Sequence, residues 1–243
     1  MEKPSKEHSL AASIFLHLLP GLLTAVCYFS LVPVVSSWGF PSVMALCLSG
    51  MIVLIPFVSF TLFTAKKRMK VPLKNGVIRY LQPLKMKQYL LWIPVVFISS
   101  GLLFLAFSFA SDALHPLFSW IPDELMLDMG LEGGYSGPSL VITYGVFLVL
   151  IVFLLPVTEE IYFRGYLLPR MPVRLKGWAP LVHSGLFALY HLWTPWLFIT
   201  RTISVLPLAY VVRWKQNIYI GIVAHCLVNS IDFFAGLAFL LKM

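Results

Sequence analysis

The sequence predicts an all-α membrane protein, a polytopic bundle of transmembrane helices, on three observations: its composition, its apolar segments and its charge distribution. The 243 residues are 59% hydrophobic and only 12% charged, with a mean hydropathy of +0.87. Such values lie outside the range of ordinary soluble domains. Because a spanning helix needs about 20 mainly apolar residues, a chain of this length has room for about seven or eight spans joined by short loops.

The N-terminal part of the chain, residues 1–139, is predicted to form the scaffold. Apolar runs predict spans at residues 10–35, 40–65 and 89–111. The segment 66–87 between the second and third spans carries eight Lys and Arg residues and no acidic residue. Positively charged loops stay on the cytoplasmic side, so this segment orients the protein.

The loop that follows the third span carries the opposite charge. Residues 112–139 contain five acidic side chains and no Lys or Arg, which places the loop outside by contrast. Residues 140–243 then form the predicted catalytic part of what is one integral membrane domain.

Spans in this second part are predicted at residues 140–158, 178–200, 202–212 and 217–241, which makes seven with the N-terminus inside. The run 202–212 is short, and we expect it to be tilted, broken or only partly crossing. We expect a multi-pass protein of the plasma membrane.

The net charge of +8 does not indicate a nucleic-acid partner, because the basic residues lie in the loops between apolar runs. An interface with the anionic headgroups of a lipid bilayer explains this distribution better. The three cysteines, Cys27, Cys47 and Cys226, all lie within apolar runs. An odd number of membrane-buried thiols argues against a disulfide framework.

Three charged residues interrupt the apolar pattern at the end of the run 140–158. Glu159 and Glu160 are adjacent, and Arg164 follows at a spacing of i,i+4 from Glu160, which allows an ion pair on a helix. Glu159 points about 100 degrees away around the axis, toward a different neighbour. One carboxylate can therefore be held by the arginine while the other acts as a base in a dry site. The alternative is that both glutamates only cap and solvate the helix end.

Histidines in two later apolar runs are the second candidate feature. His191 lies in the run 178–200, and His225 shares a helix face with Asn229 at a spacing of i,i+4. Such a histidine is more often a packed core residue, but polar side chains inside membrane segments are functional candidates. His183 has no partner at helical spacing and is interpreted as structural. His17 lies near a kink and carries no signal.

A carboxylate, two histidines and an amide on three separate spans suit hydrolysis by activated water, with the amide and a histidine as oxyanion donors. Zinc stays an alternative, since Glu159, His191 and His225 are residue types that bind it, although HExxH is absent. A serine or cysteine nucleophile fits poorly, because Ser184 lacks a GxSxG turn and Cys226 faces away from His225.

The motifs Glu159-Glu160-x-x-x-Arg164, Phe187-x-x-x-His191 and His225-x-x-x-Asn229, in this order, resemble the CPBP family of type II CAAX prenyl endopeptidases and bacteriocin-processing or immunity proteins. The resemblance covers residues 140–235. It implies an all-helical intramembrane protease, commonly of eight spans, whose membrane-embedded active-site cavity opens to the cytoplasm.

By this resemblance, Glu159 activates the water with the help of His191, and His225 with Asn229 forms the oxyanion hole. Glu160 and Arg164 support the site. No metal or other cofactor is expected, since an amide is a poor zinc ligand and a good oxyanion donor. The implied substrate is a lipid-modified protein C-terminus of the prenylated CAAX type, or a small peptide such as a bacteriocin.

Two other classes of function compete with the protease. The first is a non-proteolytic binding, immunity or scaffolding protein of the same fold, which would have no need of all four of Glu159, His191, His225 and Asn229. The second is a proton-coupled transporter that uses Glu159 as its relay. A transporter predicts inverted repeats with broken helices in both halves, whereas the polar residues here gather in the C-terminal half.

Overall fold

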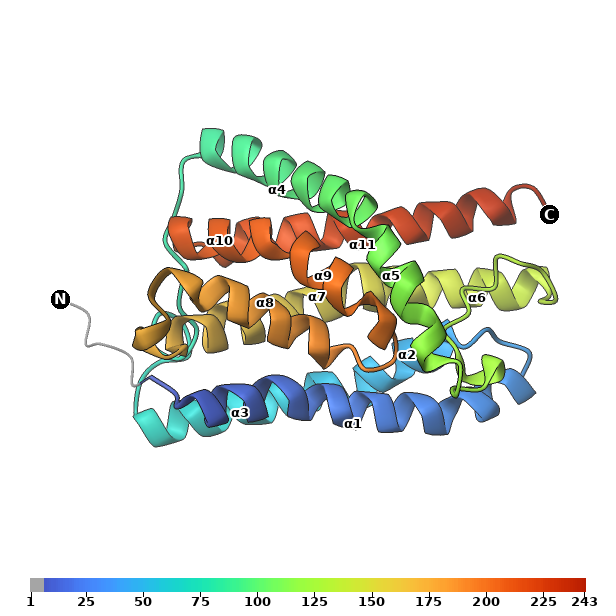
Figure 1. Cartoon of the computed structure of the whole chain (residues 1–243), viewed down its shortest axis with the longest axis horizontal. Helices are drawn as coiled ribbons and strands as arrows, with labels where there is room; N and C mark the ends of the chain where they lie inside the picture. Colours follow the sequence, from blue (N-terminus) through green and yellow to red (C-terminus); the bar gives the residue numbers. More distant parts are fainter. Residues whose placement is uncertain (1–6) are drawn as a thin grey trace.

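The computed structural model describes residues 7–243 and shows a bundle of helices that run along one common direction (Figure 1). Five helices in this part of the chain are long and apolar enough to cross a membrane: Leu10–Ser37, Val43–Met69, Met86–Ala106, Gly137–Arg170 and Ile218–Leu240. A bent pair, Pro195–Ser204 with Leu206–Lys215, makes a sixth if it is one span. The all-α fold with several membrane-spanning candidates is confirmed, and five or six of the predicted seven or eight spans are found by length and composition in residues 7–243.

The α-helices of the described chain are α1 Leu10–Ser37, α2 Val43–Ser49, α3 Ile55–Met69, α4 Met86–Ala106, α5 Ser108–Leu114, α6 Gly137–Phe147, α7 Leu155–Glu159, α8 Ala179–Tyr190, α9 Phe198–Ser204, α10 Leu206–Lys215 and α11 Ile218–Leu240. Three π-helical segments continue these helices without a break in the chain direction: η1 Gly50–Leu54, η4 Leu148–Leu154 and η5 Glu160–Leu167. Short 3-10 turns are η2 His115–Phe118, η3 Asp123–Leu125, η6 Leu168–Arg170, η7 Val173–Trp178 and η8 Pro195–Leu197.

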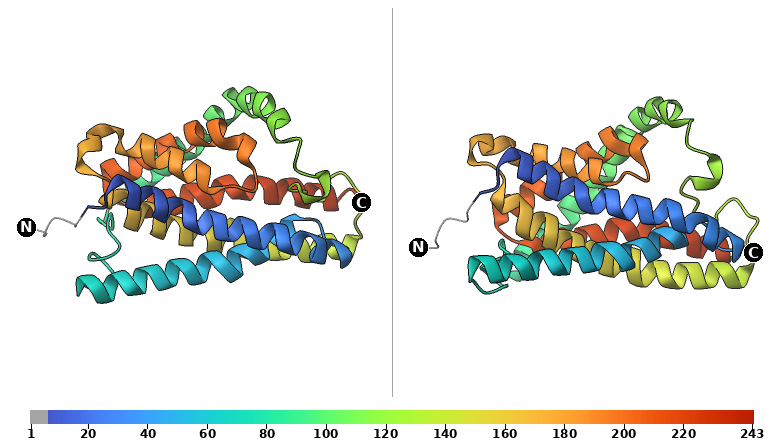
Figure 2. Two further views of the ribbon diagram at one scale, coloured as in Figure 1. Left: turned by 60° about the horizontal axis from the view of Figure 1, so that its bottom comes forward. Right: turned by 90° about the horizontal axis from the view of Figure 1, so that it is seen from below.

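The two ends of the bundle differ in charge. We call the end where α1, α4, α8 and α11 begin the basic end, because the Lys- and Arg-rich segments that follow α3 and η5 and the basic last turn of α10 lie there (Figures 1 and 2). We call the opposite end, where α6 begins and the chain ends, the acidic end (Figure 1). All basic segments predicted to share a side therefore do so.

The predicted span 178–200 is not one helix. Helix α8 ends at Tyr190, and His191 leaves the helical region with φ −83° and ψ 62°. Thr194 precedes Pro195, and the α conformation is sterically disfavoured for a residue that precedes proline. The chain then turns back through α9 and α10, which are bent by 43° at Val205. Of the three outcomes expected for the run 202–212, tilted, broken or only partly crossing, the structure shows a broken helix.

A strap, residues 70–85, crosses the basic end between α3 and α4 and fixes the elements beneath it. The Arg79 N–H donates to the Gly165 carbonyl at 2.8 Å, and the Ile218 N–H donates to the Tyr80 carbonyl at 2.7 Å. Tyr80 adopts a left-handed conformation, with φ of 60°, which is uncommon for a residue with a Cβ. The strap thereby holds the first turn of α11 against the middle of η5.

The core that surrounds the site is aromatic. The side chains of Tyr162, Phe163, Phe187 and Tyr190 are all buried, and Phe163 packs against the rings of Phe187 and Tyr190 at 5.0 and 4.9 Å. Helix α1 lies against α8 at this level, and the Tyr162 hydroxyl donates to the Leu16 carbonyl of α1 at 2.8 Å. The aromatic core thus fixes η5, α8 and α1 relative to one another.

Candidate active site

The two adjacent glutamates lie inside the protein, where α7 passes into η5. Glu159 is 7% exposed, and Glu160 and Arg164 are fully buried. Neither carboxylate therefore solvates a helix end, as the simpler interpretation would require. A buried charge is costly unless it is paired, so the partners of these groups define the site.

Glu160 is paired on two sides. Its Oε1 lies 3.0 Å from Arg164 Nη1, the predicted i,i+4 pair, and accepts a hydrogen bond from His225 Nδ1 at 2.9 Å. The guanidinium of Arg164 also lies over the ring of Phe187, 3.9 Å from its centroid. Arg164, Glu160 and His225 therefore form a continuous chain that sets the orientation of the imidazole on α11.

Glu159 faces different partners, as its position about 100 degrees around the helix predicts. The Tyr190 hydroxyl donates to Glu159 Oε1 at 3.2 Å. Its Oε2 lies 3.9 Å from His225 Nε2, which is beyond hydrogen-bond distance. The structure thus places one ring nitrogen of His225 toward each of the two carboxylates.

His191 stands at the end of α8, directly after Tyr190. Its Nδ1 lies 2.8 Å from the Phe187 carbonyl. A carbonyl oxygen can only accept, so Nδ1 carries the proton and Nε2 presents a lone pair. His191 also interacts electrostatically with His225 and Arg201. A histidine held in this tautomer can accept a proton or a hydrogen bond from water.

Asn229 lies one turn beyond His225 on α11, as predicted. Its Nδ2 donates to the Ile151 carbonyl in η4 at 2.8 Å. A side-chain amide has two N–H groups, so the second remains as a donor beside His225. The six predicted site residues therefore come from three neighbouring segments, with Asn229 at the margin.

Two further residues of the site were missed by sequence reasoning. Tyr190 holds Glu159, and Arg201 of α9 interacts electrostatically with Glu159 and Tyr190. The Arg201 Nη2 donates to Thr194 Oγ1 at 3.1 Å. With Arg201 present, two guanidinium groups balance the two carboxylates. The sequence does contain one indication of Arg201. It is a lone arginine between the predicted spans 178–200 and 202–212, on the outer side, where the positive-inside rule disfavours a basic residue.

Whether the site suits a metal ion depends on how the side chains that could act as ligands are arranged. Among residues 7–243, no group of three or more His, Cys, Asp or Glu side chains is arranged to hold a metal ion. The Nδ1 atoms of His225 and His191 are bonded to Glu160 and to the Phe187 carbonyl, so the Nε2 atom of each ring is the one that could face a metal. Glu159, His191 and His225, the ligands of the zinc alternative, are therefore not arranged as a metal-binding group within residues 7–243.

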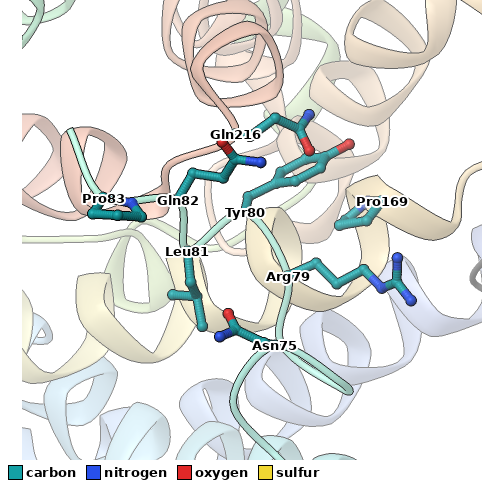
Figure 3. A pocket seen from close by; sticks show the side chains of 8 residues that line it. All are labelled: Asn75, Arg79, Tyr80, Leu81, Gln82, Pro83, Pro169 and Gln216. Atoms are coloured by element: carbon teal, nitrogen blue, oxygen red, sulfur yellow. The ribbon is translucent and has the colours of Figure 1, made fainter. Parts of the chain in front are cut away.

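The larger cavity, of about 360 Å³, lies at the basic end and not on the glutamates. It is lined by the strap from Asn75 to Pro83 together with Pro169 and Gln216 (Figure 3). A smaller cavity of about 250 Å³ lies between α5 and η8. Neither of these two cavities is lined by Glu159, so neither is the membrane-embedded cavity expected at the active site.

The fold and the site together define a helical membrane protein that buries a cluster of carboxylate, histidine and arginine side chains. Residues 138–231 match the family model described as type II CAAX prenyl endopeptidase Rce1-like. This match confirms the resemblance to the CPBP family, and the matched segment contains all six predicted site residues. It supports an intramembrane protease of the CAAX type. No curated protein and no solved structure matches the chain.

Proposed function

We propose that this protein is an intramembrane endopeptidase in which the carboxylate of Glu159 activates a water molecule. The observation that carries the proposal is the division between the glutamates. Glu160 is committed to Arg164 and His225, whereas within residues 7–243 Glu159 accepts a hydrogen bond from the Tyr190 hydroxyl and faces His225 Nε2. A buried carboxylate with few hydrogen-bond donors is a competent general base.

In the proposed reaction, water loses a proton to Glu159 and its oxygen attacks the carbonyl carbon of the scissile peptide bond. The Nε2 lone pair of His191 accepts a second hydrogen bond from the same water and directs it. The protonated Glu159 then delivers its proton to the leaving amine as the carbon–nitrogen bond breaks. The products are a carboxylic acid and an amine, so atoms and charges balance.

Two groups on α11 stabilise the oxyanion of the tetrahedral intermediate. His225 donates from Nε2 when that nitrogen carries a proton, and Asn229 donates from the amide N–H that the Ile151 carbonyl does not take. Glu160 and Arg164 keep the imidazole in place. The proposed mechanism uses no metal.

The proposed substrate is a protein C-terminus in the membrane, with or without a prenyl group, or a small peptide. The family match supports a protein or peptide substrate. We also propose that the basic end faces the cytoplasm at the plasma membrane, because Lys- and Arg-rich segments remain on that side.

The proposal is tested with purified protein in detergent and a panel of quenched fluorescent peptides, prenylated and not. Glu159→Gln keeps the shape of the side chain and removes the base, so we expect kcat/KM to fall by about 100- to 10,000-fold. Glu132→Gln, on the exposed acidic loop, is the matched control and should cleave as wild type.

A strong chelator separates the two mechanisms. Cleavage that is indifferent to the chelator supports the glutamate mechanism, and loss that zinc restores assigns Glu159, His191 and His225 as metal ligands. Cleavage that persists in Glu159→Gln contradicts the proposed base. If no peptide is cleaved, while a cellular phenotype survives Glu159→Gln and His191→Gln, the binding or immunity function replaces the protease.

A further inference from the structure

A second cluster of buried polar side chains lies where α1 packs against α8. It consists of Ser13, His17 and Thr24 on α1 and His183 and Ser184 on α8, and all five are buried. We call these five residues the histidine-pair cluster. It adjoins the active site, because Phe163 contacts both His17 and His183, and Phe187 lies one helical turn after His183.

The hydrogen bonds of the two histidines have a defined direction. His17 Nδ1 lies 2.6 Å from the Ser13 carbonyl and must donate to it, so His17 Nε2 is an acceptor. That nitrogen lies 2.9 Å from His183 Nδ1, which is then the donor. His183 Nε2 is left as a lone pair, and it has no partner among residues 7–243.

Arg164 has the complementary need. Its Nη1 lies beside Glu160 and its plane lies over Phe187, but its Nε and Nη2 have no hydrogen-bond partner in the described chain. Both His17 and His183 interact electrostatically with this guanidinium. A buried acceptor without a donor and buried donors without an acceptor thus lie around the same two packed rings, Phe163 and Phe187.

The chemistry of the cluster selects its occupant. It contains no carboxylate, and the neighbouring guanidinium repels cations, so a metal ion is not suited to it. The group required must accept from Arg164 and donate to His183, and it can bond further to the hydroxyls of Ser13 and Ser184, which also have no partner in residues 7–243. Water does both and is commonly held by two to four buried polar groups.

We propose that one buried water molecule bridges Arg164 and His183 Nε2, and that His17 and His183 are positioning residues for the active site. The chain of contacts then runs from α1 through the two histidines and the water to Arg164, Glu160 and His225. The proposal rests on the proposed function, and it extends the site to α1, outside the matched segment 138–231.

The test exploits two amides that imitate different nitrogens of the imidazole. In His183→Asn the amide occupies the position of Nδ1, which keeps the bond to His17 and removes the acceptor toward the water. In His183→Gln the amide oxygen takes the position of Nε2 and keeps that acceptor. A pair that serves only to join α1 and α8 would favour the Asn variant, whereas a water-binding pair favours the Gln variant.

We expect His183→Asn to lower kcat by about 10- to 100-fold with KM unchanged, as a misplaced site does, and His183→Gln to stay within about threefold of wild type. His115→Asn, at an exposed histidine in η2, is the control. Equal activity of the two His183 variants, or the reverse order, overturns the positioning role.

A readout independent of cleavage is a high-resolution density map of Glu159→Gln, in which His17 and His183 are native. Density for one water within hydrogen-bond distance of His183 Nε2 and of Arg164 supports the proposal. A dry space there, or a direct bond between Arg164 and His183, overturns it. The map decides the matter even if a His183 variant does not fold or if no peptide is cleaved, so failure of the protease assignment stays distinguishable.

Discussion

Adjacent carboxylates acquire different roles here because a helix turns them toward different neighbours. Glu160 meets Arg164 and His225, while Glu159 meets Tyr190 and faces the second nitrogen of His225. Gly221 of α11 permits this arrangement. A Cβ at this position would lie 2.7 Å from Glu160 Oε2 and 3.0 Å from Val212 Cγ2. A glycine is therefore needed for the close approach of α11 to the supporting carboxylate.

Gly221→Ala is expected to push Glu160 away from His225 and to lower kcat/KM by at least about tenfold, with a loss of stability of about 1–3 kcal/mol from overpacking. Gly145→Ala is the matched control, since a Cβ there meets nothing within 4 Å. The control should leave activity unchanged and alter stability by no more than about 1 kcal/mol. Peptide cleavage and thermal unfolding in detergent measure both effects. A fully active Gly221→Ala would contradict the assigned role of Glu160.

At the scale of elements, the site depends on π-helical turns and on the early end of α8. The segments η4 and η5 flank α7, and carbonyls within them accept hydrogen bonds from other elements: Ile151 from Asn229 and Gly165 from Arg79. Single π-turns inside α-helices are frequent at functional sites. The end of α8 at Tyr190 lets His191 leave the helix directly after the residue whose hydroxyl bonds to Glu159.

Helix α1 approaches the end of α8 closely through a glycine. A Cβ on Gly21 would overlap the carbonyl oxygen of Tyr190, the residue that holds Glu159 and precedes His191. We expect Gly21→Ala to separate the two helices and to abolish most peptide cleavage, although Gly21 lies far from the site in sequence. The matched control is Gly185→Ala on α8, where a Cβ meets nothing within 4 Å. Similar cleavage rates for the two variants would show that α1 does not position Tyr190.

At the scale of the whole molecule, the segregation of charge at the two ends predicts orientation. Cysteine-free protein carrying Lys74→Cys in the strap or Glu132→Cys in the acidic loop distinguishes the sides. In intact cells, an impermeant maleimide should label the cysteine at position 132 and spare that at position 74 until the membrane is opened. The reverse pattern would place the basic end outside and contradict the proposed cytoplasmic side.

Glu7 and His8 are docked at the basic end, on the segment that follows η5. The Val173 N–H donates to Glu7 Oε2 at 2.6 Å, and the His8 N–H donates to the Arg170 carbonyl at 2.8 Å. Burial, and to a lesser degree the charge of Arg170, lower the pKa of His8 from its ordinary 6.5. The docked segment therefore binds fewer protons than the released one as the pH falls below 6.5, so acid weakens docking.

Hydrogen exchange of residues 7–12, measured between pH 8 and pH 5 and corrected for intrinsic rates, should show protection that declines below pH 6.5. In His8→Gln this decline should disappear, because the titrating group is gone. A decline that persists in His8→Gln would assign it to another group.

Several features of this protein follow from sequence alone, because they depend on local patterns. The apolar runs determine the membrane helices, the i,i+4 spacing pairs Glu160 with Arg164, and the same spacing puts His225 and Asn229 on one face. The predicted division of Glu159 from Glu160 has the same origin, in the rotation of about 100 degrees per residue.

Only the tertiary structure decides which distant groups meet. The Tyr190 hydroxyl bonds to Glu159, and His17 bonds to His183 across 166 positions of the chain. Helix α8 stops at Tyr190 although its apolar run continues. The sequence pattern could not predict this end, because hydropathy indicates burial and does not indicate where a buried chain turns. Contacts between elements arise from packing, and no periodic pattern in the sequence indicates which elements pack together. The composition of the membrane bundle could therefore be predicted, whereas the completed site required the fold.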